Sequence, residues 1–240
     1  MKLISLNIEG DRHLTNRSLP FFKRESADVL CLQEVFRQDL NLIAEQTNLA
    51  DYVFVPQALV SEVNPHLPAR GEWGLAIFAN NLANIRQDFY VGRPDLVPEF
   101  FADSNPNSMS RVLLSAQVAV CDQTYQLATT HFTWSGKGEV TDLQRQNFVR
   151  LQEKLKLFPE LILCGDFNTP RGGELFDTLA KKYRDNIPGG IKTTIDADLH
   201  KSGRDIQLVV DALFTTAHYQ PKKVTVVAGV SDHMAVVAEF

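Results

Sequence analysis

The segment Leu161-Ile-Leu-Cys-Gly-Asp-Phe-Asn-Thr-Pro170 joins a short apolar run to a polar turn. Its first four residues are apolar and Gly165 follows them, a pattern that predicts a short strand. Asp166, Asn168 and Pro170 are residue types that favour turns. The segment therefore predicts a carboxylate and an amide placed directly after a strand.

Similar apolar runs recur on both sides of this segment, and turn residues bound each of them. Several are apolar at consecutive positions, which is typical of strands that are covered on both faces. The other predicted strands are Leu3–Leu6, Val29–Leu32, Tyr52–Val55, Leu75–Ala79, Val112–Val120, Tyr125–Ala128, Leu208–Phe214, Val224–Val227 and Ala235–Phe240.

Helical patterns alternate with these strands. Apolar residues recur at three- and four-residue spacing in Thr141–Phe158, where Thr141 and Gln144 can form a capping box. Ten strands, few helices and no charged or Ser/Gly-rich linker predict one α/β domain over residues 1–240. Shorter helices are predicted over Leu19–Glu25, Arg37–Thr47 and Glu174–Tyr183.

Three stretches of irregular sequence are long for a compact domain, namely Pro56–Glu72, Gly92–Ser110 and Ile187–Asp205. Loops of this size are more often functional than accidental. We therefore expect these loops to determine the choice of substrate.

Composition limits the class of protein. The 240 residues carry 24 Lys and Arg against 29 Asp and Glu, a net charge of −5, which argues against a protein that coats nucleic acid through bulk charge. No apolar run approaches the roughly 18 residues of a membrane span, and the N-terminal residues lack a signal-peptide core. The three cysteines lack metal-site spacing, so a reducing, cytoplasmic setting is expected. No feature indicates an obligatory protein partner.

Polar side chains follow several of the predicted strands, and we expect them to converge in one cleft if neighbouring strands end at one sheet edge. Carboxylates gathered there repel one another unless a cation compensates, and hard oxygen ligands suit Mg²⁺ or Mn²⁺. His131 and His233 would supply proton transfer and positive charge. This inventory fits metal-assisted phosphoester hydrolysis. The residues that follow strands are Asn7, Glu9, Glu34, His131, Asp166 and Asn168. Asp211 lies inside the predicted strand Leu208–Phe214, and Asp232 and His233 precede the last predicted strand.

Six segments in order resemble the endonuclease/exonuclease/phosphatase superfamily. They are Leu-Asn-Ile-Glu-Gly (6–10), Leu-Gln-Glu-Val (32–35), Thr-His-Phe (130–132), Gly-Asp-Phe-Asn-Thr-Pro (165–170), Val-Asp-Ala-Leu-Phe (210–214) and Ser-Asp-His (231–233). The resemblance implies a four-layer α/β sandwich, with two mixed sheets face to face, helices outside and the site at one edge.

The resemblance also implies a role for each matching residue. Glu34 matches the main Mg²⁺ ligand, Asn7 lies beside the phosphate and the metal, and Glu9 and Asp232 are further metal candidates. Asp166 matches the carboxylate that activates water, and Asn168 matches an amide that contacts the scissile phosphate. His233 matches the histidine bonded to the phosphate, and Asp211 the carboxylate that orients it.

His131 matches the second histidine of one branch of the superfamily. That branch includes pancreatic-type deoxyribonucleases, sphingomyelinases, deadenylases and 5′-tyrosyl-DNA phosphodiesterases. Abasic-site endonucleases of the exonuclease III type carry a tyrosine in this region instead. The histidine therefore argues against abasic-site repair.

Other residues have weaker interpretations. Arg111 precedes a strand where relatives often have a basic residue, so it could steer phosphate or pair with an active-site acid. Trp134 either stacks on a planar substrate group near the mouth of the site or is packed down, and Phe100-Phe101 has the same two interpretations. The histidines outside the motifs are interpreted as ordinary surface or core residues: His13, His66, His200 and His218.

The sequence predicts a Mg²⁺- or Mn²⁺-dependent phosphodiesterase that uses metal-activated water. Nucleic acid is the first-choice substrate, as DNA ends, single strands or adducts, and the net acidity predicts local recognition with a shallow salt dependence. One alternative is a non-nucleic phosphoester such as sphingomyelin, another phospholipid or an inositol phosphate. Another is a non-catalytic binding module, which ranks low because no motif is missing.

Overall fold

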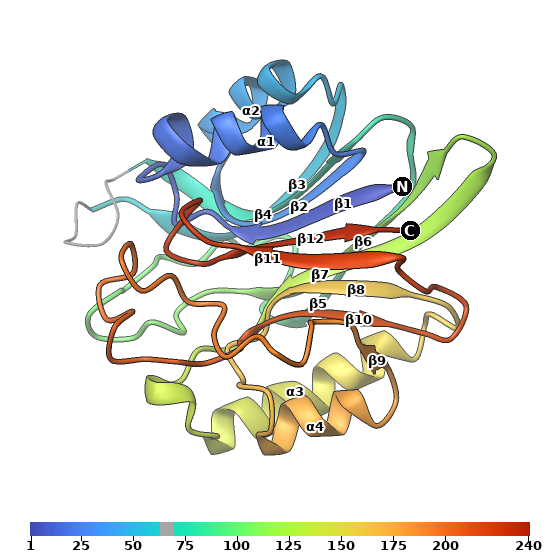
Figure 1. The fold of residues 1–240 in the computed structure, drawn as a ribbon. Coiled ribbons are helices and arrows are strands. Elements are labelled where there is room, and N and C mark those ends of the chain that lie inside the picture. Colours follow the sequence, from blue (N-terminus) through green and yellow to red (C-terminus); the bar gives the residue numbers. More distant parts are fainter. Residues whose placement is uncertain (63–69) are drawn as a thin grey trace.

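The computed structural model describes residues 1–62 and 70–240 and shows two six-stranded sheets packed face to face (Figure 1). Helices α1 (Leu19–Glu25) and α2 (Leu40–Thr47) cover the outer face of the first sheet. Helices α3 (Asp142–Leu155) and α4 (Glu174–Ala180) cover the outer face of the second. This arrangement confirms the expected four-layer α/β sandwich.

The first sheet has the strand order β11-β12-β1-β2-β4-β3. Its central pair, β1 and β2, is parallel, and the other neighbouring strands are antiparallel. The sheet is therefore mixed, as the family resemblance implied. The strands are β1 (Lys2–Asn7), β2 (Val29–Phe36), β3 (Asp51–Val60), β4 (Gly71–Ala79), β11 (Lys223–Val227) and β12 (Ala235–Glu239).

The second sheet has the order β5-β6-β7-β8-β10-β9 and repeats this plan. Only β7 and β8 are parallel among its described strands. Each sheet thus has one parallel pair at its centre. The strands are β5 (Leu82–Val91), β6 (Arg111–Val120), β7 (Gln123–His131), β8 (Ile162–Asp166), β9 (Arg184–Asp185) and β10 (Asp211–Thr215).

Apolar side chains fill the space between the sheets and beneath each helical layer. Leu3 and Val29 of the first sheet pack with Leu114 and Leu127 of the second, all without exposed surface. The buried apolar area drives this packing. Cys31 and Cys164 belong to the same cluster and are free buried thiols.

Helix α3 shows how closely the sequence pattern reports local structure. The Thr141 hydroxyl accepts a hydrogen bond from the Gln144 amide at 3.2 Å, and the Gln144 side chain accepts one from the Thr141 amide. This capping box confirms the predicted start. Phe148, Leu151 and Leu155 lie on the buried face of the helix. The α-helix ends at Leu155, three residues before the predicted end.

The predictions missed or shortened some elements. Strand β5 was missed because it lies at a sheet edge, where half of its residues are exposed and the polar run Arg86–Asp88 interrupts the apolar pattern. The two-residue β9 was also missed. Strand β3 continues to Val60 and β4 begins at Gly71, so both ends of the stretch Pro56–Glu72 are regular, contrary to expectation. His66 lies outside the described residues. Across 1–62 and 70–240, no helix combines the length and apolarity needed to span a membrane.

Candidate active site

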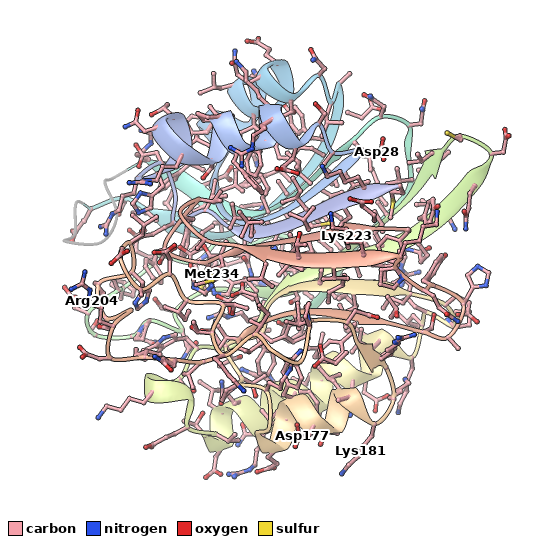
Figure 2. The ribbon with its side chains drawn as sticks, in the orientation of Figure 1. Asp28, Asp177, Lys181, Arg204, Lys223 and Met234 are labelled. Atoms are coloured by element: carbon pink, nitrogen blue, oxygen red, sulfur yellow. The ribbon has the colours of Figure 1, made fainter. Side chains whose placement is uncertain are left out.

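The two central parallel pairs place the predicted site residues at one edge of the sandwich. Asn7 ends β1 beside Gln33 of β2, and His131 ends β7 beside Asp166 of β8. Asp211 begins the antiparallel strand β10 directly opposite Asp166. The ends of parallel strands share an edge, so side chains distant in sequence meet there. Figure 2 labels Met234, the residue after His233, near this edge, away from the chain termini seen in Figure 1.

Three site residues adopt backbone conformations that L-residues seldom use. Glu9, Glu34 and Asn168 have φ values of 49°, 61° and 48°. The pairing of β2 with β4 shifts register between Leu32 and Val35, which places Glu34 in a bulge. Such conformations cost free energy and concentrate at functional sites. Glu34 lies within β2, and Glu9 and Asn168 each lie two residues beyond the end of a strand.

Gly165 permits the close approach of the two parallel strands at the site. Its φ is 131°, and a Cβ there would lie 2.1 Å from the carbonyl oxygen of Thr130. Any other residue would separate β7 from β8 or distort the turn. The Gly-Asp-Phe-Asn motif therefore contains a structural requirement directly beside Asp166.

Asp211, His233 and Asp166 form a buried charged group in which one contact is a hydrogen bond and the other an ion pair. The Nδ1 of His233 lies 2.8 Å from Oδ2 of Asp211, and its Nε2 lies 3.8 Å from Oδ2 of Asp166. These carboxylates raise the pKa of His233 well above its ordinary value, although burial acts in the opposite direction. The imidazole is therefore held with both nitrogens protonated and Nε2 directed towards Asp166.

Asn7 links the carboxylates of the two sheets. Its Nδ2 donates to Oε1 of Glu34 at 2.9 Å and to Oδ2 of Asp166 at 3.2 Å. Burial and the nearby charge of Asp232 raise the pKa of Glu34 to about 8. The structure thus brings Asn7, Glu34 and Asp166 together, as the sequence predicted.

Glu9 lies at the side of this group. Its backbone amide donates to Oδ1 of Asn7 at 3.1 Å, and its carboxylate contacts Arg12 at 2.9 Å and His13 at 3.3 Å. Burial and the charge of Asp232 raise the pKa of Glu9 to about 7. Glu9 is therefore part of the site's charge network, and so is His13, which the sequence interpretation set aside.

His131 lies in the opposite electrostatic setting from His233. Its Nε2 is 3.6 Å from Oδ2 of Asp166 and 3.9 Å from Oε1 of Glu34. Burial and the charge of Arg111 lower its pKa to about 3. Trp73 contacts the imidazole edge-on, with ring centroids 6.3 Å apart. His131 is thus a neutral imidazole at neutral pH.

Asn168 completes the turn after β8. Its backbone amide donates to Oδ1 of Asp166 at 2.8 Å, and its side-chain Nδ2 donates to the carbonyl oxygen of Phe132 at 3.1 Å. The turn therefore fixes the Asp166 carboxylate and ties β8 to the segment after β7.

Arg111 lies behind the site. Its guanidinium is almost fully buried and donates to the carbonyl oxygen of His131 at 3.0 Å and to Oδ1 of Asn107 at 2.9 Å. These contacts place it under the strand end and give it a neighbouring amide and carbonyl as partners. Its charge reaches the site through the interior, by lowering the pKa of His131.

Asn107 holds the backbone of Trp134 from both sides. Its Oδ1 accepts from the Trp134 amide at 2.9 Å, and its Nδ2 donates to the Trp134 carbonyl at 3.0 Å. The indole itself is 46% exposed. Phe100 instead packs against Trp73 with centroids 5.0 Å apart, while Phe101 is 52% exposed. The exposed aromatic residues of these loops are therefore Trp134 and Phe101.

Comparison with known proteins agrees with this geometry. A model of the Endonuclease/Exonuclease/phosphatase family matches residues 4–233. The chain belongs to this family. Members of the family are phosphoester hydrolases, so the match supports phosphoester hydrolysis here. No curated protein matches the sequence significantly.

Solved structures share the fold of the family at low sequence identity. An endonuclease/exonuclease/phosphatase from Bacteroides vulgatus has a TM-score of 0.68 at 18% identity, covering 99% of this chain and 97% of that one. A mannosyl-6-phosphatase from Bacteroides thetaiotaomicron has 0.66 at 15%, covering 100% and 98%. The human nocturnin catalytic domain with bound sulfate has 0.64 at 16%, covering 99% and 92%. At these identities the likeness shows the fold.

The side chains at the edge are compatible with a divalent metal, which enzymes of this family typically use. Atoms of Asp166, Asp211 and His233 lie within 4.8 Å of one another. Burial and the nearby charge of Asp232 raise the pKa values of Glu9 and Glu34, and a bound cation would favour their charged forms. Oxygen donors of this kind fit a hard cation.

The sequence interpretation treated His200 as an ordinary residue, but the structure places it beside His233. Its ring contacts His233 edge-on, with centroids 6.4 Å apart at 77°. The available signal was its position within the long stretch Ile187–Asp205, which was expected to be functional. No motif indicated which residue of that stretch would reach the site.

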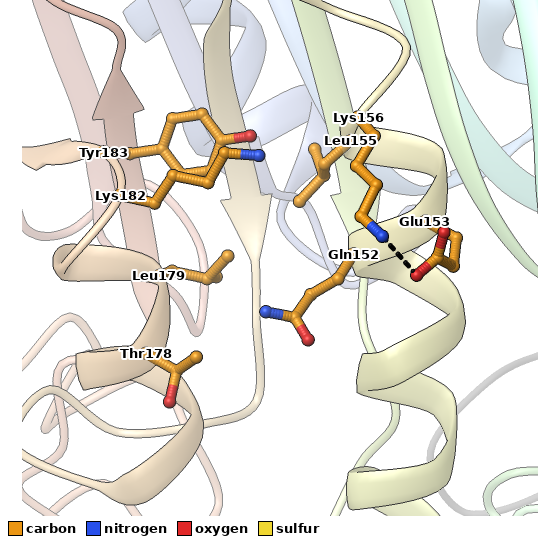
Figure 3. Close-up of a pocket in the computed structure, with 8 residues that line it drawn as sticks. All are labelled: Gln152, Glu153, Leu155, Lys156, Thr178, Leu179, Lys182 and Tyr183. Carbon is orange, nitrogen blue, oxygen red and sulfur yellow. Dashed lines mark hydrogen bonds and ion pairs between the residues drawn. The ribbon is translucent and has the colours of Figure 1, made fainter.

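A separate cavity of about 210 Å³ lies between α3 and α4 (Figure 3). Gln152, Thr178 and Tyr183 are among its lining residues, and Lys156 pairs with Glu153 at its rim at 2.6 Å. The helices belong to the outer layer, and no predicted site residue lines this cavity. The candidate chemistry therefore lies at the sheet edge.

Proposed function

We propose that the protein is a Mg²⁺- or Mn²⁺-dependent phosphodiesterase that hydrolyses nucleic acid, such as DNA ends, single strands or adducts. The observation that carries the proposal is the cluster in which Asp211 bonds to His233, the other ring nitrogen of His233 lies 3.8 Å from Asp166, and Asn7 joins Asp166 to Glu34 by hydrogen bonds. It combines a charged imidazole, a carboxylate beside it and an amide bridge to a second carboxylate. The proposed unit is a single domain over residues 1–240.

Each side chain has a definite part in this mechanism. Asp166 accepts a proton from the attacking water, and its position is held by the amide of Asn168. His233 donates from Nε2 to a phosphate oxygen, and the bond from Nδ1 to Asp211 keeps it protonated. His131 and Asn168 provide further polar contacts to the phosphate.

The proposed metal site lies on the Glu34 side. Asp211 already bonds to His233, so a metal between them would have to break a 2.8 Å contact. When bound, the ion would neutralise carboxylate charge and polarise the phosphoryl oxygens. The residues proposed to hold it are Glu34, Asn7, Glu9 and Asp232.

Exposed aromatic residues support nucleic acid over the alternatives. Trp134 has a fixed backbone and an exposed indole, which suits stacking on a base. Phe101 is exposed in the neighbouring loop. The three free cysteines fit a reducing, cytoplasmic setting. Phospholipids and inositol phosphates remain the second candidates. Sugar phosphates join them because a mannosyl-6-phosphatase shares the fold.

The test is hydrolysis of a substrate panel with Mg²⁺ and with Mn²⁺. The panel contains single- and double-stranded DNA, RNA, 5′-tyrosyl DNA, sphingomyelin, inositol phosphates, mannose 6-phosphate and bis(p-nitrophenyl) phosphate. Asp166→Asn should abolish hydrolysis while leaving the melting temperature within a few degrees. Asp122→Asn, in an exposed turn, is the matched control and should retain activity. Activity that survives both EDTA and Asp166→Asn would contradict the mechanism.

A further inference from the structure

The segment 194–204 is tied to the strand ends that carry the proposed catalytic residues. The Thr194 carbonyl accepts from the Met234 amide at 2.7 Å, and the Asp196 amide donates to the Asp232 carbonyl at 2.8 Å. The Thr194 hydroxyl also accepts from the amides of Val210 and Asp211, both at 3.1 Å. The segment therefore keeps a fixed position relative to Asp211 and His233.

The shape of the segment is also specified internally. The buried Asp196 carboxylate accepts the amides of Asp198 at 2.9 Å and Leu199 at 3.0 Å through one oxygen, and the amide of Gly229 at 2.7 Å through the other. A Cβ at Gly203 would lie 2.1 Å from the Asp196 carbonyl oxygen. These hydrogen bonds and the close packing at Gly203 give the segment 194–204 a defined conformation.

These contacts place one imidazole beside the catalytic one. The His200 amide donates to the Asp196 carbonyl at 3.1 Å, and the ring contacts His233 edge-on. The Nδ1 of His200 accepts the Ser202 amide at 3.0 Å. In the neutral ring the proton must then lie on Nε2, so His200 offers a hydrogen-bond donor at that atom. Figure 2 shows Arg204 of the same segment at the end of the molecule where Met234 lies.

The two sides of the site differ in chemistry. Trp134 follows His131 and presents an exposed indole, whereas His200 adjoins His233 and presents a polar ring. A phosphodiester has two substituents on its phosphorus, and each would face one of these sides. A planar group suits the indole, and an oxygen-bearing group suits the imidazole donor.

We propose that His200 is a specificity-determining residue, whose Nε2–H donates a hydrogen bond to an oxygen of the substituent on the His233 side of the scissile phosphate. The acceptor is a sugar oxygen or an oxygen of the adjacent phosphate in an oligonucleotide. This inference rests on the proposed function. It adds a polar contact beyond the phosphate itself, and it assigns that contact to the segment 194–204.

The test compares substrates that have or lack such an oxygen. His200→Ala should lower kcat/KM for a 5′-phosphorylated dinucleotide, which carries both acceptors, by roughly fivefold to tenfold, mainly through a higher KM. Hydrolysis of bis(p-nitrophenyl) phosphate, whose substituents are aryl groups, should change less than about twofold. His200→Gln keeps a donor and should lose less, and His218→Ala, at an exposed histidine, is the matched control.

A 5′-phosphorylated dinucleotide distinguishes the two acceptors. A loss that requires the added phosphate identifies the adjacent phosphate, and a loss shared by both dinucleotides identifies a sugar oxygen. Asp196→Asn should reproduce the selective loss by loosening the segment, with a lower melting temperature. If Asp196→Asn lowers activity only on dinucleotides and not on bis(p-nitrophenyl) phosphate, the loss comes from the displaced His200 contact and not from general instability.

Three results would overturn the inference. One is an equal loss on all substrates with His200→Ala, which would mean that the ring acts only through His233. The others are no loss on any dinucleotide, or a parent that cleaves bis(p-nitrophenyl) phosphate and no dinucleotide. A parent that hydrolyses no phosphoester with either metal would instead contradict the proposed function.

Discussion

His131 and His233 lie beside the same carboxylate in opposite electrostatic settings. Both Nε2 atoms face Oδ2 of Asp166, at 3.6 Å and 3.8 Å. Burial and Arg111 lower the pKa of His131 to about 3, whereas Asp211 and other carboxylates raise the pKa of His233 well above its ordinary value. One imidazole is neutral at neutral pH and the other is charged.

The difference shows that burial alone favours a neutral ring and that neighbouring carboxylates are needed to keep a buried ring charged. Burial disfavours the charged form of both histidines, and the carboxylates around His233 overcome that cost. His131 has the buried Arg111 nearby, and this positive charge lowers the pKa of His131 further than burial alone. A bound phosphate would therefore meet two different groups: a charged hydrogen-bond donor from His233 and a neutral polar contact from His131.

Removing each imidazole should give unequal losses. His233→Ala should lower kcat roughly a thousandfold or more because the charged donor to the phosphate disappears. His131→Ala should lower kcat by about a hundredfold because a neutral contact is lost. Steady-state kinetics on bis(p-nitrophenyl) phosphate with Mg²⁺ measures both, with His218→Ala as the control. Equal losses, or a larger loss for His131→Ala, would contradict the division of roles.

The sequence predicted much of the fold because apolar runs and turn residues report buried strands directly. The Thr141–Gln144 capping box was predicted for the same reason, since it depends on neighbouring residues. Strand β5 was missed because polar residues interrupt it and half of it is exposed, so neither alternation nor an apolar run marks it.

The candidate site was predictable only in part. The strand ends and motifs indicated which side chains would meet, but charge states depend on partners from distant segments. Arg111 lies 20 residues from the carbonyl that it bonds, and Asp211 lies 22 residues from His233. His200 is recognisable only once the segment 194–204 is seen against His233. Spatial contact, which local pattern does not encode, determined these roles.

The charge on His233 should depend on Asp211. Asp211→Asn removes the negative charge that favours the imidazolium, so the pKa of His233 should fall. The alkaline limb of kcat/KM against pH should then move to lower pH, with a loss of roughly tenfold to a hundredfold that grows as pH rises. A pH–rate profile from pH 5 to about 9 measures this. An unchanged limb would exclude His233 as its source.

The neutrality of His131 should depend less on its partner. Arg111→Met removes the buried positive charge, so the pKa of His131 should rise, but burial remains and should keep it below the ordinary value of about 6.5. The lost hydrogen bonds to His131 and Asn107 should also cost about 2 kcal/mol, lowering the melting temperature by roughly 4–8 °C.

An NMR titration of the imidazole protons measures the pKa of His131 directly, and kcat should fall by no more than about tenfold because Arg111 lies behind the strand end. Asp122→Asn, which leaves the interior unchanged, serves as the control for the titration. A His131 titration identical in parent and variant would show that burial alone keeps this ring neutral. The two histidines would then differ through Asp211 and its neighbouring carboxylates, with no contribution from the arginine.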